Sequence, residues 1–316
     1  MSVKEETLLL VAPVTWAGIW TAPIAAQAPE LKVFVHDRDE YDPAAIDYVL
    51  SFRPPPGLLK TLPNIRAVFS LGAGVDGFLA DPEYPRQVPL VRFVHESLAR
   101  EMAHYAVLHA LLFHRRQRNF DAAQTDHAWR QSFPPRKTED THIGIFGMGE
   151  IGCVIAAAFR DLGFPVTGWS RTRKDLSGVR SYAGEAERAE FLAGTDILVC
   201  VLPLTDDTRG ILNKDLFAQL PRGAYLINIA RGGHQVPEDI ISAIDGGQLE
   251  GATLDVFDPE PLPPNSPLWS HPKITVTPHV AALTDPFVMA KSAVDGIRLI
   301  QSGKPLINVV DFERGY

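Results

Sequence analysis

Cysteine is scarce in this sequence of 316 residues, which contains only Cys153 and Cys200. Each lies within an apolar run rather than in a turn, which argues against a disulfide framework and against a zinc site made of cysteines. The sequence also lacks a His-Glu-x-x-His, EF-hand or Walker motif, so we expect no metal site. Such sparing use of cysteine is typical of a reducing compartment, and we therefore expect a cytoplasmic protein.

Long apolar runs are also missing, because no segment reaches the roughly 20 apolar residues that a membrane-spanning helix requires. The first apolar stretch, 8–14, lacks a basic region before it and a small-residue cleavage site after it, so we expect no secretory signal. Positive charge is in deficit, since 30 Lys and Arg face 38 Asp and Glu for a net charge of −8. These absences argue against membranes and nucleic acids as partners.

The composition that remains, 46% hydrophobic and 22% charged, is that of a packed globular protein. At roughly 150 residues a domain, the length predicts two domains. A long helix is predicted from Ala99 to about Arg118, followed by a loop over 130–140. The region before this helix has short β-rich runs punctuated by Pro, Gly and Asp, which predict strands at 8–11, 31–36, 47–52, 66–71 and 90–94.

Beyond the loop, apolar strands and helical stretches alternate regularly. Such alternation is typical of βαβ units and of a parallel sheet covered on both faces. A last helix, 286–301, is predicted to return to the first region. The strands of this second region are predicted at 142–146, 165–169, 196–202, 224–229, 251–257 and 274–277.

A glycine-rich run follows the first strand of the second region and opens an apolar helix. Its residues are Gly147-Met148-Gly149-Glu150-Ile151-Gly152. In this context, glycines permit a tight turn, close approach of the backbone to a pyrophosphate, and close packing of helix on strand. The helix N-terminus then offers unpaired N–H groups to the phosphates. We interpret the run as a dinucleotide-binding loop, the alternative being a purely structural turn.

The next strand ends where dinucleotide-binding proteins place the group that recognises the adenosine ribose, about 20 residues after the glycines. No acidic residue stands there to bind a 2′-hydroxyl. The run Ser170-Arg171-Thr172-Arg173-Lys174 instead offers a hydroxyl and three cations, which suit a 2′-phosphate. The sequence therefore favours NADP(H) over NAD(H), with Ser170, Arg171 and Arg173 as contacts. The alternative is a solvated basic turn.

Three polar residues follow three consecutive predicted strands: Arg231, Glu260 and His279. In an open parallel sheet, ligands bind beyond the carboxyl ends of the strands. Each residue alone has a structural explanation, as a surface cation, a solvated acid or a capped imidazole. Together they suit the reduction of a 2-keto acid, which needs an anchor for the substrate, a hydride donor and a proton donor.

In this interpretation Arg231 binds the substrate carboxylate or polarises the ketone oxygen through two parallel N–H bonds. His279 is the acid that protonates the oxygen as hydride reaches C2. Glu260 pairs with the imidazole of His279, orients it and favours its charged form.

The sequence resembles the D-isomer-specific 2-hydroxyacid dehydrogenases and, within that family, the glyoxylate and hydroxypyruvate reductases. The resemblance implies the fold: an α/β protein in which a Rossmann-type doubly wound parallel sheet domain, residues 99–283, is inserted in a smaller flavodoxin-like α/β substrate domain, residues 1–98 and 284–316. The matching segments extend over most of the chain and lie at 71–76, 147–152, 169–174, 228–232, 254–262 and 277–282.

The resemblance also implies roles for individual residues. Arg231, Glu260 and His279 would form the catalytic triad, and Asp255 would hold the nicotinamide carboxamide. The substrate carboxylate would meet the backbone of a loop from the opposite domain, so that the active site is a cleft between the two. That loop comprises Ala73, Gly74 and Val75, and further cofactor contacts are expected at Leu202, Pro203, Ile229 and Ala230.

Two expectations about substrate and assembly follow from the same resemblance. Phe52 and Arg53 stand where the reductases carry Trp and His, so they are expected to contact the substrate and to alter the size of its pocket. A homodimer is expected, joined through the cofactor domain, with residues 120–129 as an arm.

We therefore predict an enzyme that uses NADPH to reduce small 2-keto acids, glyoxylate to glycolate and hydroxypyruvate to D-glycerate. The first alternative is a reductase of bulkier 2-keto acids such as phenylpyruvate. The second is a nucleotide-sensing binding module on the same fold, because binding relatives can retain the triad. NADPH consumption with a panel of 2-keto acids discriminates between them.

Overall fold

The computed structural model describes residues 5–131 and 136–315. The chain divides into two compact units, a smaller unit of Met1–His95 with Thr284–Tyr316 and a larger unit of Glu96–Leu283. The predicted boundary before Ala99 falls inside the first helix of the larger unit, α3, Glu96–His114. Part of the predicted loop 130–140 lies outside the described residues.

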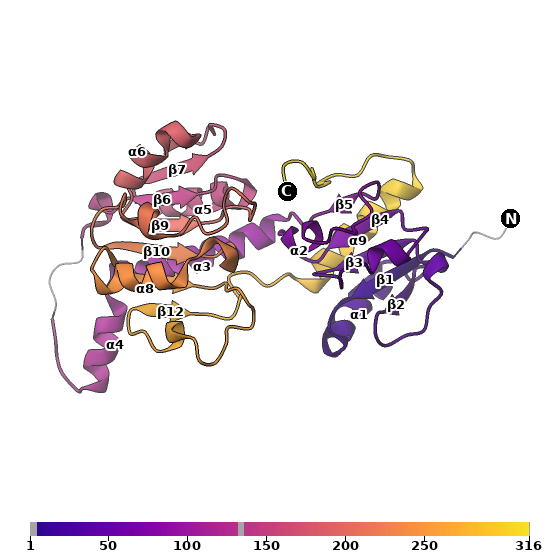
Figure 1. Cartoon of the computed structure of the whole chain (residues 1–316), viewed down its shortest axis with the longest axis horizontal. Helices are drawn as coiled ribbons and strands as arrows, with labels where there is room; N and C mark the ends of the chain where they lie inside the picture. The colour runs from indigo at the N-terminus through magenta and orange to yellow at the C-terminus, as the bar shows by residue number, and fades with distance from the viewer. Residues whose placement is uncertain (1–4, 132–135, 316) are drawn as a thin grey trace. The chain divides into compact units, whose positions relative to one another are not determined.

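The smaller unit is built on a parallel five-stranded sheet in the order β2-β1-β3-β4-β5 (Figure 1). This is the flavodoxin-like order that the resemblance implied. Every residue of β1, β3 and β4 is buried, which explains why these strands are continuous apolar runs. The strands are β1 Thr7–Val11, β2 Lys32–Val35, β3 Tyr48–Ser51, β4 Ala67–Ser70 and β5 Leu90–Val91.

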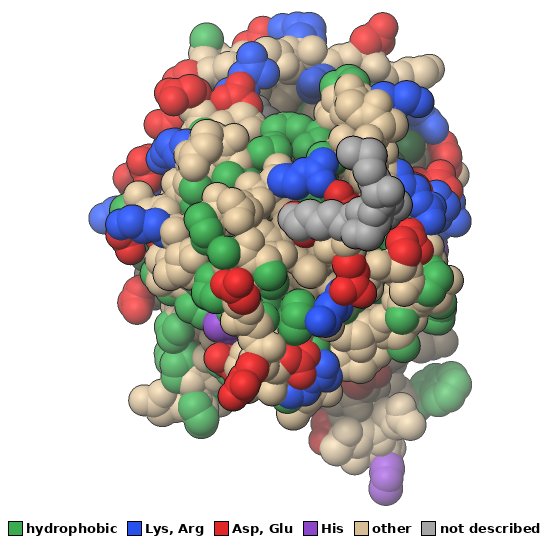
Figure 2. All heavy atoms as spheres, turned by 90° about the vertical axis from the view of Figure 1, so that its right-hand side faces the viewer, with side chains coloured by type: hydrophobic (Ala, Val, Ile, Leu, Met, Phe, Trp, Pro, Cys, Tyr) green, Lys and Arg blue, Asp and Glu red, His purple; other side chains and the backbone are tan. Residues whose placement is uncertain are grey.

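Helices from both ends of the chain complete the smaller unit. α1, Ala17–Gln27, packs against α9, Pro286–Gln301, while α2 is a single turn, Asp76–Leu79. The carboxylate of Asp285 accepts hydrogen bonds from the first N–H groups of α9, which starts the helix where its proline predicts. On the face drawn in Figure 2, acidic and basic side chains are interspersed.

The larger unit contains a parallel seven-stranded sheet in the order β12-β11-β10-β9-β6-β7-β8 (Figure 1). The chain order reverses between β6 and β9, and such a switch point is where Rossmann-type sheets bind ligands. The strands are β6 Ile143–Phe146, β7 Val166–Ser170, β8 Val179–Ala183, β9 Ile197–Cys200, β10 Ala224–Asn228, β11 Leu249–Leu254 and β12 Ile274–Val276. The helices after α3 are α4 Gln117–Thr125, α5 Glu150–Asp161, α6 Arg188–Ala193, α7 Lys214–Phe217 and α8 Pro237–Asp245.

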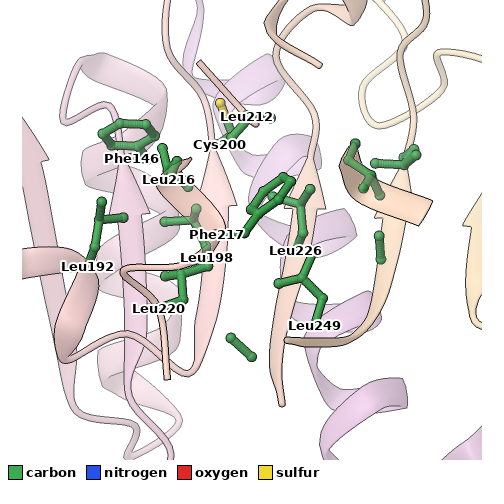
Figure 3. Packing of buried hydrophobic residues seen from close by; sticks show 14 of the residues in the cluster. Phe146, Leu192, Leu198, Cys200, Leu212, Leu216, Phe217, Leu220, Leu226 and Leu249 are labelled. Carbon is green, nitrogen blue, oxygen red and sulfur yellow. The ribbon is translucent and has the colours of Figure 1, made fainter. Parts of the chain in front are cut away.

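Alternate residues of the central strands pack into two apolar layers, one on each face of the sheet. On one face Phe146, Leu198 and Leu226 meet residues of α6, α7 and α8 (Figure 3). On the other face their neighbours, such as Ile145 and Ile227, meet α3 and α5. Because side chains alternate along a strand, both faces are buried and the predicted doubly wound parallel sheet is confirmed.

The end of one predicted helix is wrong, and two elements were not predicted. The predicted helix to Arg118 ends at His114, because Arg116 adopts a left-handed conformation, φ 57°, before α4 begins. Sequence patterning also missed α1 and the edge strand β8, in which only Tyr182 is buried. His109 and His114, which lie on α3, are buried. None of the helices in the part of the chain that the structure describes is long and apolar enough to cross a membrane.

Candidate active site

The glycine-rich run forms the turn between β6 and α5. Gly147 has a φ of 121°, and a Cβ there would lie 2.8 Å from the carbonyl oxygen of Val201. A Cβ on Gly152 would overlap the carbonyl of Gly147, so this glycine permits close packing of helix on strand. These two glycines are required by the fold itself.

Gly149 differs from the other two, because a Cβ there would meet no described atom within 4 Å. It is exposed and is the N-cap of α5, where no side chain accepts a hydrogen bond from the first N–H groups. An exposed helix N-terminus with open donors favours a bound anion. The turn therefore fits a pyrophosphate, with Gly149 allowing close approach.

The other residues predicted to contact a cofactor lie at the same carboxyl edge of the sheet with different exposures. Glu150 is exposed and Ile151 is half-buried. The side chain of Met148 is buried against Gly168, so only its backbone can face a ligand. The segments after β9 and β10 place Leu202, Ile229 and Ala230 in buried positions and Pro203 in an exposed one.

Residues 170–174, which we name the basic turn, begin at the last residue of β7. The hydroxyl of Ser170 donates to the carbonyl of Thr172 at 2.7 Å. Arg173 binds the carbonyl of Ser181 and, at 2.5 Å, the carboxylate of Glu187. The side chain of Arg171 is exposed. Sequence reasoning missed Glu187, whose carboxylate forms an ion pair with the guanidinium of Arg173.

Arg231 lies three residues beyond the end of β10 and is half-buried. The fully buried side chain of Asn228 fixes this turn by accepting from the N–H of Ala230 and donating to the carbonyl of Arg231. A Cβ on Gly232 would overlap the backbone of Phe257, so the ends of β10 and β11 meet closely. The guanidinium donates to the carbonyl of Ala230 at 2.6 Å. Local backbone contacts thus hold Arg231 at the sheet edge.

The structure brings His279 and Glu260 together. The Nδ1 of His279 lies 2.9 Å from one carboxylate oxygen of Glu260, and the other oxygen accepts from the N–H of Phe257, also at 2.9 Å. Since an ionised carboxylate only accepts, Nδ1 carries a proton, which leaves Nε2 to exchange one with a ligand. The side chains of both residues are about one-third exposed, 34% and 35%.

The electrostatics of Glu260 link this pair to Arg231. Burial favours the neutral carboxyl, but the hydrogen bonds from His279 and Phe257 and the nearby charge of Arg231 outweigh it, and the pKa of Glu260 is lowered. Arg231, Glu260 and His279, which we name the polar cluster, therefore act on one another. A cation, a carboxylate and an imidazole at one sheet edge can bind an anion and transfer a proton.

Asp255 has a role that sequence reasoning missed. Its carboxylate is fully buried, and it accepts from the Thr277 hydroxyl at 2.5 Å, the Val280 N–H at 2.9 Å and the Ala281 N–H at 2.8 Å. Its carbonyl accepts from the N–H of His279, which has a positive φ of 56°. Asp255 therefore holds the turn 277–281. Burial outweighs these bonds and raises the pKa of Asp255. In the sequence, this role was indicated only by the position of Asp255, a single acidic residue directly after an apolar strand.

The residues predicted to contact substrate from the smaller unit lie in the turns after β3 and β4. The ring of Phe52 is 51% exposed and lies over Gly72, since a Cβ on that glycine would be 3.3 Å from the ring. The guanidinium of Arg53 lies 3.8 Å from the carboxylate of Asp76. Ala73 and Gly74 are half-buried, whereas Val75 is buried and can offer only its backbone.

Within residues 5–131 and 136–315, no group of three or more His, Cys, Asp or Glu could hold a metal ion.

Comparison with known proteins identifies the family. The model of the D-isomer specific 2-hydroxyacid dehydrogenase NAD binding domain matches residues 107–281. Glyoxylate/hydroxypyruvate reductase A of Klebsiella pneumoniae (strain 342) is 40% identical over 302 residues, 94% of this chain and 96% of the relative.

The solved structures that resemble the whole chain include two complexes with NADPH or NADP. One is a D-isomer specific 2-hydroxyacid dehydrogenase from Xanthobacter autotrophicus Py2 in complex with NADPH and MES, with a TM-score of 0.93, 37% identity and coverage of 99% of this chain and 100% of that one. The other is an NADPH-dependent glyoxylate/hydroxypyruvate reductase from Sinorhizobium meliloti in complex with NADP and sulfate, with a TM-score of 0.91, 38% identity and coverage of 98% and 100%. The chain belongs to the D-isomer-specific 2-hydroxyacid dehydrogenase family.

Proposed function

We propose that this protein uses NADPH to reduce small 2-keto acids, glyoxylate to glycolate and hydroxypyruvate to D-glycerate, with His279 as the proton donor. The observation that carries the proposal is the 2.9 Å contact between His279 Nδ1 and Glu260, next to Arg231 at the edge of the sheet. The curated relatives at about 40% identity are named glyoxylate/hydroxypyruvate reductase A, which supports this choice of substrates.

The cofactor proposed is NADP(H), which supplies the hydride when bound. The N–H groups at the start of α5 and the open space at Gly149 suit its pyrophosphate. Ser170, Arg171 and Arg173 are the proposed ligands of the 2′-phosphate, and Arg173 also binds the carboxylate of Glu187. The larger unit is thus the proposed cofactor domain and the smaller unit the substrate domain.

The chain's own residues then perform binding and proton transfer. Arg231 binds the carboxylate or the ketone oxygen, and its fixed fork orients C2 of the substrate. His279 donates the proton on Nε2 to the ketone oxygen as negative charge develops there, and Glu260 stabilises the imidazolium through Nδ1. In the smaller unit, the backbone of Ala73, Gly74 and Val75 is proposed to bind the carboxylate, and Phe52 and Arg53 to limit substrate size. Asp255 is proposed to retain an acceptor position for the nicotinamide carboxamide while it holds the turn.

We also propose a cytoplasmic homodimer joined through the region around α4. Phe120 on this helix is 38% exposed and Trp129 just beyond it is 93% exposed. Aromatic side chains this exposed are typical of interfaces. Light scattering on the purified protein should give a mass twice that of one chain.

Loss of NADPH absorbance tests the proposed reaction. We expect turnover with glyoxylate and hydroxypyruvate, and slower turnover with phenylpyruvate or with NADH. Faster turnover with phenylpyruvate would assign the site to bulkier 2-keto acids. Binding of NADPH without turnover of any 2-keto acid would instead indicate a nucleotide-sensing module.

A further inference from the structure

A chain of hydroxyl groups connects α3 to the turn that carries His279. The phenol oxygen of Tyr105 lies 2.5 Å from the hydroxyl oxygen of Thr277. The hydroxyl of Thr277 lies 2.5 Å from the carboxylate of Asp255. All three residues belong to the larger unit, although 172 positions separate the first two along the chain.

The hydroxyl protons of Tyr105 and Thr277 determine which group donates and which accepts in this series of hydrogen bonds. An ionised carboxylate cannot donate, so the single hydroxyl proton of Thr277 goes to Asp255. Thr277 therefore accepts from Tyr105, whose phenol is the donor. Burial raises the pKa of Tyr105, which keeps this proton in place at neutral pH. Hydrogen bonds aligned in this way polarise and strengthen one another.

At its Asp255 end, this series of hydrogen bonds fixes the backbone around the imidazole of His279. The oxygen of Asp255 that accepts from Thr277 also accepts from the N–H of Val280, and its second oxygen accepts from Ala281. The carbonyl of Asp255 accepts from the N–H of His279 at 2.8 Å. His279 needs this support because its backbone is left-handed, φ 56°, which is strained for a residue with a Cβ.

The near end of the chain is anchored in a rigid element. The ring of Tyr105 packs against the buried ring of His109 one turn along α3, with centroids 4.2 Å apart and planes tilted by 40°. Tyr105 and Met102, on the same face of the helix, both pack against the buried core. A hydroxyl fixed on a packed helix can set the position of a loop that it contacts.

We propose that Tyr105, acting through Thr277 and Asp255, is a positioning residue that holds the His279 turn in its reactive geometry. The proposal rests on the proposed function of His279 as proton donor. Tyr105 does not touch substrate or cofactor in this account.

Paired substitutions test the proposal. Tyr105→Phe removes only the donor, Thr277→Val removes the middle of the chain, and Thr277→Ser retains it. Tyr225→Phe is the matched control, because it removes a hydroxyl that also bonds a threonine, Thr253, at 2.9 Å within the same core. For each full-length variant we would measure NADPH-dependent turnover of glyoxylate and hydrogen exchange of the amides of Val280 and Ala281.

Tyr105→Phe and Thr277→Val should lower kcat by about 3- to 10-fold, the effect of one lost hydrogen bond, with the KM for NADPH unchanged. Exchange at the two amides should accelerate. Thr277→Ser and Tyr225→Phe should match the wild type in both measurements.

Unchanged exchange and kcat in Tyr105→Phe would overturn the proposal, as would equal losses in Tyr225→Phe, which would indicate general loosening of the core. Faster exchange with unchanged kcat would also overturn the positioning role. If the wild type reduced no 2-keto acid, the proposed function would fail, while the exchange measurement would still decide whether Tyr105 holds the turn.

Discussion

The polar cluster and the basic turn lie at the carboxyl edge of one sheet but are held in different ways. In the polar cluster, Glu260 and His279 bind each other, and buried Asp255 fixes the backbone beneath the imidazole. In the basic turn, Arg171 and Arg173 are exposed cations on a surface turn, and the guanidinium of Arg173 is paired with Glu187.

The two ways of holding side chains suit two different tasks, proton transfer in the polar cluster and cofactor recognition in the basic turn. Proton transfer demands fixed geometry, which internal hydrogen bonds supply before any ligand arrives. Recognition of a phosphate depends more on charge, which a surface turn can supply and which solvent and salt weaken. Substitutions in the polar cluster should therefore change kcat, and those in the basic turn should change the KM for one cofactor.

His279→Ala should have the largest effect. Loss of the proton donor should lower kcat for glyoxylate reduction by about 10²- to 10⁴-fold, while NADPH binding stays within about 2-fold of the wild type. Steady-state kinetics and a fluorescence titration with NADPH would measure the two quantities. His271→Ala is the matched control, because this histidine of the same unit pairs with Asp245 away from the polar cluster and should leave kcat unchanged. Comparable kcat values in the two variants would contradict the assigned role.

Arg171→Ala should raise the KM for NADPH by roughly 10-fold and leave the KM for NADH nearly unchanged, because only NADPH carries the 2′-phosphate. Arg173→Ala should change the two KM values in the same directions, because its guanidinium belongs to the same basic turn. Parallel assays with the two cofactors check both. Equal losses with NADPH and NADH would refute the assignment of the basic turn to the phosphate.

Salt should separate the two regions without a substitution. Raising the ionic strength from about 0.01 M to 1 M shortens the screening length from about 30 Å to 3 Å, so the KM for NADPH should rise severalfold. The kcat at saturating cofactor should change little, because short internal bonds hold the polar cluster. A kcat that fell in step with cofactor affinity would remove the distinction between the regions.

The smallest expected effect is that of Glu260→Gln on the free energy of unfolding. This effect should depend on pH. The folded protein lowers the pKa of Glu260 from about 4.5, so the ionised carboxylate stabilises the fold above that pH and ceases to do so as the pH falls through the lowered value. The variant should be less stable than the wild type at pH 7 by about 1 kcal/mol or less, because the pair is partly exposed.

Urea unfolding at several pH values measures this difference in the free energy of unfolding. The two proteins should converge as the medium becomes acidic. A difference that stayed constant or grew in acid would mean that the carboxylate does not stabilise the folded state.

The sequence predicted best those features that depend on local pattern. Apolar runs predicted the central strands, and the glycine spacing located the β6–α5 turn, since Gly147 and Gly152 are required by backbone contacts at short range. The placement of Arg231, Glu260 and His279 just beyond strand ends indicated one sheet edge, because parallel strands end on the same side.

Features that depend on distant contacts could not be predicted. Strand β8 has a single buried residue, Tyr182, and is held by pairing with β7 at the sheet edge. The ion pair between Arg173 and Glu187 forms only when β8 brings the carboxylate back to the basic turn. The buried contacts of Asp255 likewise depend on the turn after β12, which sequence spacing alone does not place beside it.

A crystal structure with NADP and oxamate, an unreactive analogue of a 2-keto acid, tests the central claim most directly. The account predicts His279 Nε2 at about 2.6–3.2 Å from the amide carbonyl oxygen of oxamate, which stands in for the ketone oxygen of a substrate. It also predicts that the Glu260 contact to Nδ1 stays intact and that the guanidinium of Arg231 bonds the same ligand. An imidazole turned away from the ligand, with Arg231 beyond contact, would contradict it.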